Sequence, residues 1–215
     1  LSHTDWKRES YSGRAPTERP FFQPVSLDPR QARLLISLAH RRTAEVETVI
    51  DPFCGTGGIV IESALQGIET LASDLDPRMV EGTRENLASF DVEGTVETCD
   101  VSEIESLWGS RSNCAFVFDP PYGRSSWSSA KDMEPFFQAL SAANRIDPQG
   151  TLSTMLPTTP ESLQAEPSDD VEVMGMPWSE LEPKIIERGW KPVIRTPVRV
   201  HSSLARMVVV CHPSD

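Results

Sequence analysis

The sequence lacks several features that mark common classes of protein. Its four cysteines include no C-x-x-C pair and its four histidines are scattered, which argues against a zinc ribbon, a dithiol motif or a bound metal. No apolar run reaches about 18 residues, so no membrane-spanning helix is expected. The first ten residues lack the apolar core of a secretory signal. These absences predict a protein of the reducing cytoplasm.

Lysine is also scarce. The 215 residues contain 4 Lys against 16 Arg, and the net charge is −12, which is unfavourable for contacts with nucleic-acid phosphates. The charge is unevenly spread, at +4 over residues 1–42, −12 over 43–118 and −4 over 119–215. Four prolines in a polar context predict an extended N-terminal arm over residues 1–30, before one domain over residues 31–215. Because the sequence does not begin with Met, we expect it to be a piece of a longer protein.

Beyond the arm, apolar strand-like runs alternate with helical patterns, which predicts an α/β fold with a mostly parallel sheet. We expect residues 157–177, rich in Pro, Glu and Asp, to form a surface loop. Two β-rich runs flank residues 201–203 and predict an antiparallel hairpin at one edge of the sheet. The expected strands are 48–53, 69–76, 95–99, 114–118 and 151–156, and the expected helices begin at Asp28 and span 57–66, 77–90, 133–144 and 178–189.

A glycine-rich turn joins the first predicted strand to the helix that follows it. The turn contains Gly55, Thr56, Gly57 and Gly58, and it lies at the carboxyl edge of the predicted sheet, where α/β folds bind ligands. Glycine lets the backbone approach a ligand and adopt positive φ angles. No Gly-Lys-Ser/Thr follows, so an ATP-type phosphate loop is excluded. The turn predicts a cradle for a nucleotide-like cofactor, although dinucleotide folds share this feature.

Carboxylates follow the next two predicted strands. Asp74 could accept hydrogen bonds from ribose hydroxyls at the end of the second strand. Asp76 competes for this role, but the neighbouring Pro77 suggests that it caps the next helix. Asp100 follows the third strand and could accept a hydrogen bond from an adenine amino group.

The sequence Asp119-Pro120-Pro121-Tyr122 follows the apolar strand 114–118. The nitrogen of an aromatic amine is a poor nucleophile, because its lone pair is delocalised into the ring. A carboxylate and a backbone carbonyl that accept its two N–H groups would hold it and favour a more pyramidal nitrogen. Prolines supply carbonyls on a restricted backbone, and a tyrosine offers a face for stacking of a base. The motif therefore predicts a clamp for a planar amino group.

Together these residues resemble the class I S-adenosylmethionine-dependent amino-methyltransferases. More narrowly, the chain resembles the catalytic domain of the archaeal tRNA guanine-10 N2-methyltransferases and their eukaryotic counterparts. The resemblance spans about residues 14–210 and rests on Arg19-Pro20-Phe21-Phe22 with Pro24, Ser26, Leu27 and Pro29, on residues 51–58, 74–79 and 119–126, and on the 200–206 hairpin.

The resemblance implies a Rossmann-like fold, S-adenosylmethionine as cofactor, and methylation of N2 of a guanine in tRNA. It assigns the clamp residues Asp119, Pro120, Pro121 and Tyr122 to catalysis. The residues expected to bind the cofactor are Asp51, Pro52, Phe53, Cys54, Gly55, Thr56, Gly57, Asp74, Asp100, Val101 and Asp119.

For the RNA, Phe21, Phe22 and Tyr122 are candidates to receive a base that leaves its stack, and Arg14, Arg19 and Arg124 are candidates for phosphate contacts. The pair Phe21 and Phe22 could equally pack on its own domain or line a pocket. The family also implies an N-terminal THUMP-type RNA-binding module, which this sequence lacks, and allows a small zinc-binding activator subunit as a partner. Three alternatives stay open on the residues alone. One is an adenine N6-methyltransferase acting on DNA or rRNA, and another is a scaffold subunit that binds cofactor without turnover. The third is a dinucleotide oxidoreductase, which would bind NADH and give Asp119 no role.

Overall fold

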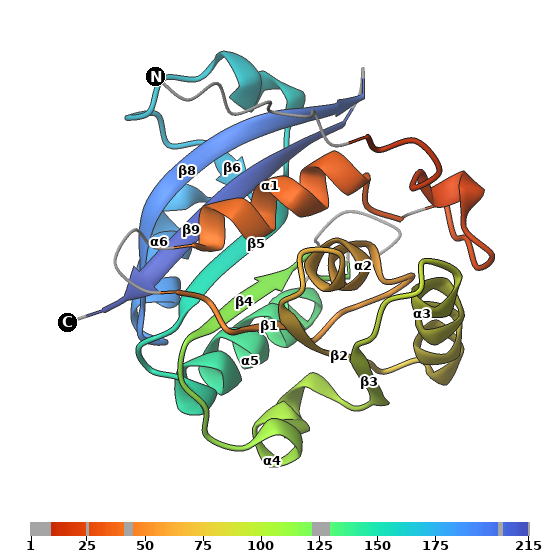
Figure 1. The fold of residues 1–215 in the computed structure, drawn as a ribbon. Helices are drawn as coiled ribbons and strands as arrows, with labels where there is room; N and C mark the ends of the chain where they lie inside the picture. The colour runs from red at the N-terminus through yellow and green to blue at the C-terminus, as the bar shows by residue number, and fades with distance from the viewer. Residues whose placement is uncertain (1–9, 25, 41–44, 122–129, 202–203, 215) are drawn as a thin grey trace, which may run out of the picture.

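The computed structural model describes residues 10–24, 26–40, 45–121, 130–201 and 204–214. A nine-stranded sheet lies between two layers of helices (Figure 1). The strands are β1 (Thr48–Asp51), β2 (Glu69–Asp74), β3 (Thr95–Thr98), β4 (Cys114–Phe118), β5 (Thr151–Thr158), β6 (Glu172–Val173), β7 (Met176–Pro177), β8 (Trp190–His201) and β9 (Leu204–Pro213). The α-helices are α1 (Pro29–Ala39), α2 (Gly58–Ala64), α3 (Pro77–Ser89), α4 (Ile104–Trp108), α5 (Ala130–Ile146) and α6 (Trp178–Ile186), with shorter 3-10 turns η1 (Pro16–Glu18), η2 (Val101–Glu103) and η3 (Pro160–Gln164).

The order β3-β2-β1-β4-β5 is parallel throughout, and β9 then pairs antiparallel with β5 and with β8. The order reverses between β1 and β4, so the carboxyl ends of these strands flank a crevice in which α/β folds bind ligands. The predicted α/β fold with an antiparallel C-terminal hairpin is confirmed.

The two helix layers bury different strand side chains. Even-numbered residues of β4 pack with α5 and α6, whereas Ala115 and Val117 pack with α1. On β9 the alternation places Val208 and Val210 on the α1 side. Strands β4 and β5 are buried on both faces, which is the pattern of a central parallel strand.

Local sequence signals explain where the helices that frame the crevice begin. Asp28 caps α1 by accepting a hydrogen bond from the Arg30 amide (2.8 Å), and Pro29 occupies the first helical position. Asp76 caps α3 in the same way, with Arg78 as donor (2.9 Å) and Pro77 in the first position. The alternative role considered for Asp76, that of a helix cap, is the one that the structure shows.

The expected surface loop over residues 157–177 was wrong in part. This segment contains η3, β6 and β7, and β6 extends the sheet by pairing Val173 with Thr158 of β5. Val173 and Met174 are fully buried in the main core despite their acidic neighbours. Because Pro, Glu and Asp dominate the composition of this segment, its few apolar residues did not predict buried strands. Helix α4 was also not expected from the sequence.

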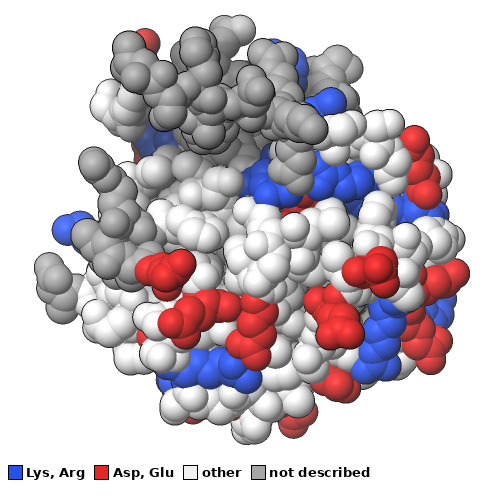
Figure 2. Space-filling model, in the orientation of Figure 1, with Lys and Arg blue, Asp and Glu red and all other residues white. Residues whose placement is uncertain are grey.

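Charge is distributed unevenly over the molecule. On the face shown in Figure 2, Lys and Arg side chains gather mainly in the upper half, where α1 lies, and Asp and Glu side chains dominate the lower half. This separation agrees with the excess of positive charge before residue 43 in the sequence. In the described part of the chain, no helix is both long and apolar enough to cross a bilayer.

Candidate functional site

A cavity of about 840 Å³ opens at the carboxyl ends of β1, β2, β3 and β4. Its volume is in the usual range for small-molecule sites. Ten of the eleven residues expected to bind a cofactor line it, and Gly57 is the exception. The residues predicted for the cofactor site therefore lie together in the fold. Asp76, the competing candidate for the ribose, also lines the cavity. The lining residues that the sequence did not single out as site residues are Gln23, Ser26, Leu27, Gly58, Ile59, Leu75, Met79, Cys99, Pro135, Gln138 and Arg206.

The glycine turn forms the floor of the cavity between β1 and α2. Gly55 and Gly57 have φ angles of +52° and +81°, which other residues rarely adopt. A Cβ atom on Gly57 would lie 2.8 Å from Cγ2 of Thr83 in α3, and the Thr83 hydroxyl donates to the Gly55 carbonyl (2.8 Å). A glycine is therefore needed at position 57 because the turn packs tightly on α3, and Gly57 itself does not line the cavity.

Asp74 connects the second strand to this turn. One of its oxygens accepts from the Gly55 amide (3.0 Å), and the other accepts from the Asp76 amide (2.9 Å). Burial raises the pKa of the Asp74 carboxyl, and these amide hydrogen bonds oppose that rise. A carboxylate has about four acceptor positions, so Asp74 can hold the turn and still accept from a ligand.

Asp51 and Cys54 are the buried groups at the base of the cavity. The Asp51 carboxylate is 1% exposed and accepts from the Phe53 amide (3.0 Å). Burial raises its pKa well above the ordinary value, and the nearby Asp74 and Asp119 charges add to the effect. Burial likewise raises the pKa of the Cys54 thiol, which excludes it as a thiolate nucleophile at neutral pH.

Asp100 follows the third strand. It accepts from the amide (2.9 Å) and hydroxyl (2.6 Å) of Ser102, and these hydrogen bonds lower its pKa. Leu75, which follows β2 between Asp74 and Asp76, lines the same cavity and is 69% exposed. An exposed leucine between carboxylates offers a flat apolar contact for an aromatic ring.

Asp119, Pro120 and Pro121 follow β4 and line the same cavity as the glycine turn, which follows the neighbouring strand β1. Pro120 is buried, whereas Asp119 is partly exposed to the cavity. Tyr122 and Arg124, the remaining predicted residues of this motif, lie outside the described residues. The predicted cradle and the described part of the predicted clamp therefore border one space.

A family model of RMKL-like methyltransferase domains matches residues 16–177 of this sequence. The match begins in the arm and includes every lining residue of the cavity except Arg206. The chain belongs to this family. The cavity of this RMKL-like methyltransferase domain is thus lined by the glycine turn and the Asp119 motif, two of the stretches on which the family resemblance is based.

Curated relatives extend the match over nearly the whole sequence. The tRNA (guanine(10)-N2)-dimethyltransferases of Methanothermobacter thermautotrophicus and Pyrococcus abyssi are each 31% identical to it, over 94% of this chain and 54% of theirs. This methyltransferase domain therefore spans about half the length of these relatives.

Solved structures establish the fold. TrmN from Thermus thermophilus superposes with a TM-score of 0.65 at 18% identity, covering 89% of this chain and 50% of that one. An S-adenosylmethionine-dependent methyltransferase from Clostridium acetobutylicum gives a TM-score of 0.65 at 12% identity, covering 88% and 94%. The fold is that of a class I methyltransferase.

The arm contributes one wall of the cavity. Gln23, Ser26 and Leu27 line the cavity, and the Thr56 hydroxyl donates to the Ser26 hydroxyl (2.8 Å). Asn86 of α3 exchanges two hydrogen bonds of 2.9 Å with the backbone of Phe21 and donates to the Thr56 carbonyl (2.9 Å). One buried amide side chain thus joins the arm, the glycine turn and α3.

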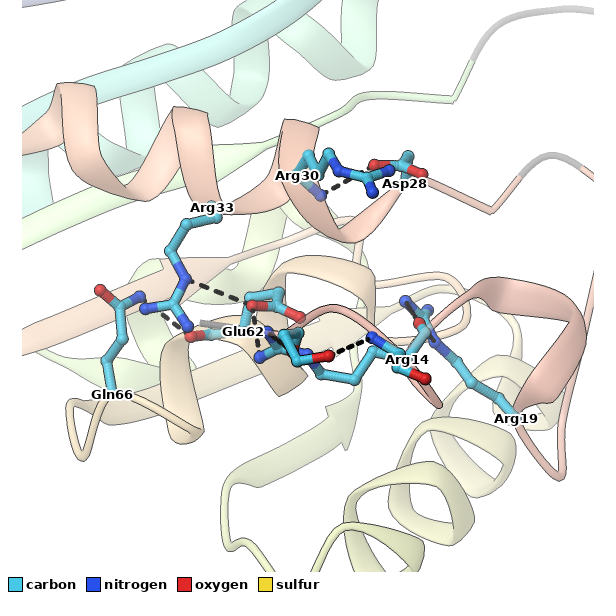
Figure 3. Close-up of polar contacts among 9 residues, drawn as sticks. Arg14, Arg19, Asp28, Arg30, Arg33, Glu62 and Gln66 are labelled. Carbon is cyan, nitrogen blue, oxygen red and sulfur yellow. Dashed lines mark hydrogen bonds and ion pairs between the residues drawn. The ribbon is translucent and has the colours of Figure 1, made fainter. Parts of the chain in front are cut away.

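Arg19, Phe21 and Phe22 of the arm were expected to contact RNA, but none of them lines the cavity. Arg19 is 5% exposed and donates to the Arg14 carbonyl, so its guanidinium lies in the interior (Figure 3). Burial lowers its pKa. The Phe21 ring packs on Gly82 of α3 and not in the cavity. Phe22, at 42% exposure, does not line the cavity either. The sequence left open whether this aromatic pair packs on its own domain or lines a pocket, and for Phe21 the structure shows packing on the domain.

A buried ion-pair cluster also attaches the arm to α1 and α2. Glu62 of α2 is fully buried, and one of its oxygens lies 3.3 Å from both Arg14 of the arm and Arg33 of α1 (Figure 3). We call Arg14, Arg33 and Glu62 the Glu62 cluster. It joins three segments that are far apart in sequence.

Gly82→Ala is expected to detach the arm from α3. The new methyl group would lie 2.1 Å from Cδ1 of Phe21, and 2.3 Å from Cγ, so the whole ring must move. Alanine favours a helix by about 1 kcal/mol over glycine, yet the overpacking should dominate and lower the free energy of unfolding by about 1–3 kcal/mol. Urea denaturation of Gly82→Ala, of Phe21→Ala and of the double variant would measure the coupling. Purely additive losses would show that the ring and Gly82 do not interact.

Proposed function

We propose that this chain transfers methyl groups from S-adenosylmethionine to N2 of a guanine in tRNA. The observation that carries the proposal is the convergence of the glycine turn, Asp74 and the Asp119-Pro120-Pro121 motif on one cavity. The names of the two archaeal relatives support guanine N2 and tRNA as the target.

The cavity fits S-adenosylmethionine in charge and shape. That cofactor carries a sulfonium and an ammonium group, and Asp51, Asp74, Asp100 and Asp119 all border the space. The diphosphate of a nicotinamide dinucleotide would instead face these carboxylates and be repelled. The exposed Leu75 provides an apolar contact for the adenine ring. A volume of about 840 Å³ has room for both cofactor and a target base.

Each group then has a role that follows from its chemistry. The glycine turn and Asp51 would hold the methionine end, Asp74 the ribose hydroxyls, and Asp100 the adenine amino group. The bound cofactor supplies an electrophilic methyl group. Asp119 and the Pro120 carbonyl accept the two N–H groups of the guanine amine, which holds its nitrogen in line for attack. No strong general base is required, because the nitrogen becomes acidic once it is methylated.

The rest of the function depends on chain outside this domain. With a net charge of −12, this sequence has little capacity for phosphate contacts. An N-terminal RNA-binding module would supply the affinity for tRNA, and a small zinc-binding subunit would act as activator. Both fit a cytoplasmic tRNA-modifying enzyme. The relatives' greater length, with only 54% covered, is compatible with an additional module.

Mass spectrometry of nucleosides from bulk RNA tests the function directly. Incubation with the chain and labelled cofactor is expected to yield labelled N2-methylguanosine and N2,N2-dimethylguanosine. A single-turnover excess of protein over RNA compensates for weak binding by an isolated domain. Labelled N6-methyladenosine in place of these products would refute the guanine assignment.

Asp74→Ala is expected to weaken S-adenosylmethionine binding by about 10- to 100-fold, as estimated for the loss of a charged hydrogen-bond acceptor. The variant also leaves the Gly55 amide without its carboxylate partner. Isothermal titration calorimetry measures the change. Glu85→Ala, which removes a charge from the exposed side of α3, should bind as the unmodified chain does. Unchanged affinity in Asp74→Ala, or tight binding of NADH, would contradict the assignment.

A further inference from the structure

One cation lines a cavity that is otherwise acidic. Among the lining residues that the structure describes, five are aspartates and Arg206 alone is basic. An arginine offers no favourable contact to the sulfonium or ammonium group of the cofactor. The position of Arg206 therefore points to the side of the cavity where the substrate would enter.

The sheet register places Arg206 across the cavity from Asp119. Phe118 of β4 is level with Thr154 of β5, and Arg206 of β9 is level with Pro157, three residues further on. Two strand spacings of about 4.8 Å and two residues at about 3.3 Å give a separation between the two Cα atoms of roughly 12 Å. A purine fits between the polar ends of two side chains at this separation if both side chains project from the sheet in the same direction.

Both residues also fall on one face of the sheet. Ala115 and Val117 of β4, like Val208 of β9, pack on the α1 side. Because side chains alternate along a strand, Asp119 and Arg206 continue these two rows toward the same side. They border one cavity, with Ser26 and Leu27 of the arm on its wall.

The edges of guanine match this pair of groups. With its N2 amine held at Asp119, a guanine presents the acceptors O6 and N7 on its far edge, and arginine binds that pair in a bidentate manner. An adenine held by its N6 amine has N7 beside the reacting amine and only N3 at the far side. Arginine would therefore give guanine two hydrogen bonds and adenine one at most.

We infer that Arg206 is a specificity-determining residue that reads O6 and N7 of the guanine whose N2 amine lies at Asp119. The inference rests on the proposed function and adds the residue that separates guanine from adenine at this site. Arg206 would contribute nothing to cofactor affinity, which distinguishes it from the aspartates of the cavity.

The test compares target RNAs that carry guanine or 7-deazaguanine at the methylated position. The analogue keeps the N2 amine and O6 but lacks the N7 acceptor. For the unmodified chain, single-turnover methylation of the analogue is expected to be about 10-fold slower than that of guanine. Arg206→Ala should methylate guanine about 10- to 100-fold more slowly and should treat the two bases alike. Arg206→Lys keeps the charge without the bidentate fork, and should restore less than a tenth of the lost rate.

Arg199→Ala is the matched control, since Arg199 lies exposed on the same hairpin, opposite Ala205 and outside the cavity. A lost phosphate contact there would slow both RNAs equally and leave their ratio unchanged. Calorimetry should show unchanged cofactor affinity in Arg206→Ala, which also verifies folding. If Arg206→Ala keeps the full penalty for 7-deazaguanine, the inference is wrong and the proposed function stands. If the unmodified chain methylates neither RNA, the proposed function itself fails, and the inference with it.

Discussion

Asp119→Asn is expected to lower methyl transfer by about 100- to 1,000-fold, the range seen when one polar group is removed from a preorganised site. The asparagine amide keeps the shape of the carboxylate but replaces one acceptor oxygen with an N–H donor. It therefore loses the negative charge, and its remaining oxygen is a weaker acceptor for the one N–H of the substrate amine that Asp119 is proposed to hold. Asp119 follows a fully buried strand, so the substitution should leave the fold intact. Single-turnover transfer of a labelled methyl group to tRNA would measure the rate.

Asp91→Asn provides the control for this substitution. Asp91 is exposed, lies away from the cavity and has a φ of +54°, a conformation that asparagine also tolerates. Its rate should match that of the unmodified chain. Calorimetric S-adenosylmethionine binding should survive within a few-fold in Asp119→Asn, because four other carboxylates line the cavity. Turnover at the original rate would remove Asp119 from the mechanism.

Glu62→Ala is expected to destabilise the fold by about 3–5 kcal/mol, the usual effect of removing one partner from a buried ion pair. The side chain of Glu62 is fully buried, and those of Arg14 and Arg33 are 9% and 16% exposed. Both guanidinium groups would lose a carboxylate that lies 3.3 Å away, without regaining water. Denaturation by guanidinium chloride, followed by circular dichroism, would give the free energy of unfolding.

Two comparisons separate the buried charges from any other effect of the substitution. Glu105→Ala breaks the exposed ion pair with Arg145, where both side chains are nearly half exposed, and should change stability by less than about 1 kcal/mol. Replacing the Glu62 cluster as a whole with Met or Leu should recover most of the loss, because no charge is then left unpaired. A loss in Glu62→Ala no larger than in Glu105→Ala would show that the cluster does not hold the arm.

The features that the sequence predicted are those that depend on neighbours along the chain. The strand before Gly55, the helix caps Asp28 and Asp76, and the run of prolines after Asp119 are all local signals. Parallel strands then bring their carboxyl ends together without further information. This rule places Asp51, Asp74, Asp100 and Asp119 around one cavity. The positions of these residues followed from the sequence, while their roles stay proposals.

The features that the sequence did not reveal depend on packing between distant segments. No residue near Arg19 in the sequence indicates that its guanidinium is buried, because the sequence around a buried arginine need not differ from that around an exposed one. Asn86 sits on α3 without any local signal, yet it bonds to a residue 65 positions earlier. Arg206 reaches the cavity only because β9 pairs with β5. The arm, assigned to residues 1–30 and taken as extended, also contains the first residues of α1 and the 3-10 turn η1; its separation from the domain stays a prediction.

Asn86 has a consequence for how the smallest autonomous unit of this fold is defined. The regular sheet begins only at Thr48, and a boundary drawn from strands and helices alone would start the unit at α1. Such a cut would remove Gln23, Ser26 and Leu27 from the cavity and leave the amide of Asn86 without Phe21. The cavity would then lose one wall while the sheet remained whole. In this fold the ligand-binding surface, and not the hydrophobic core, sets where a functional unit must begin.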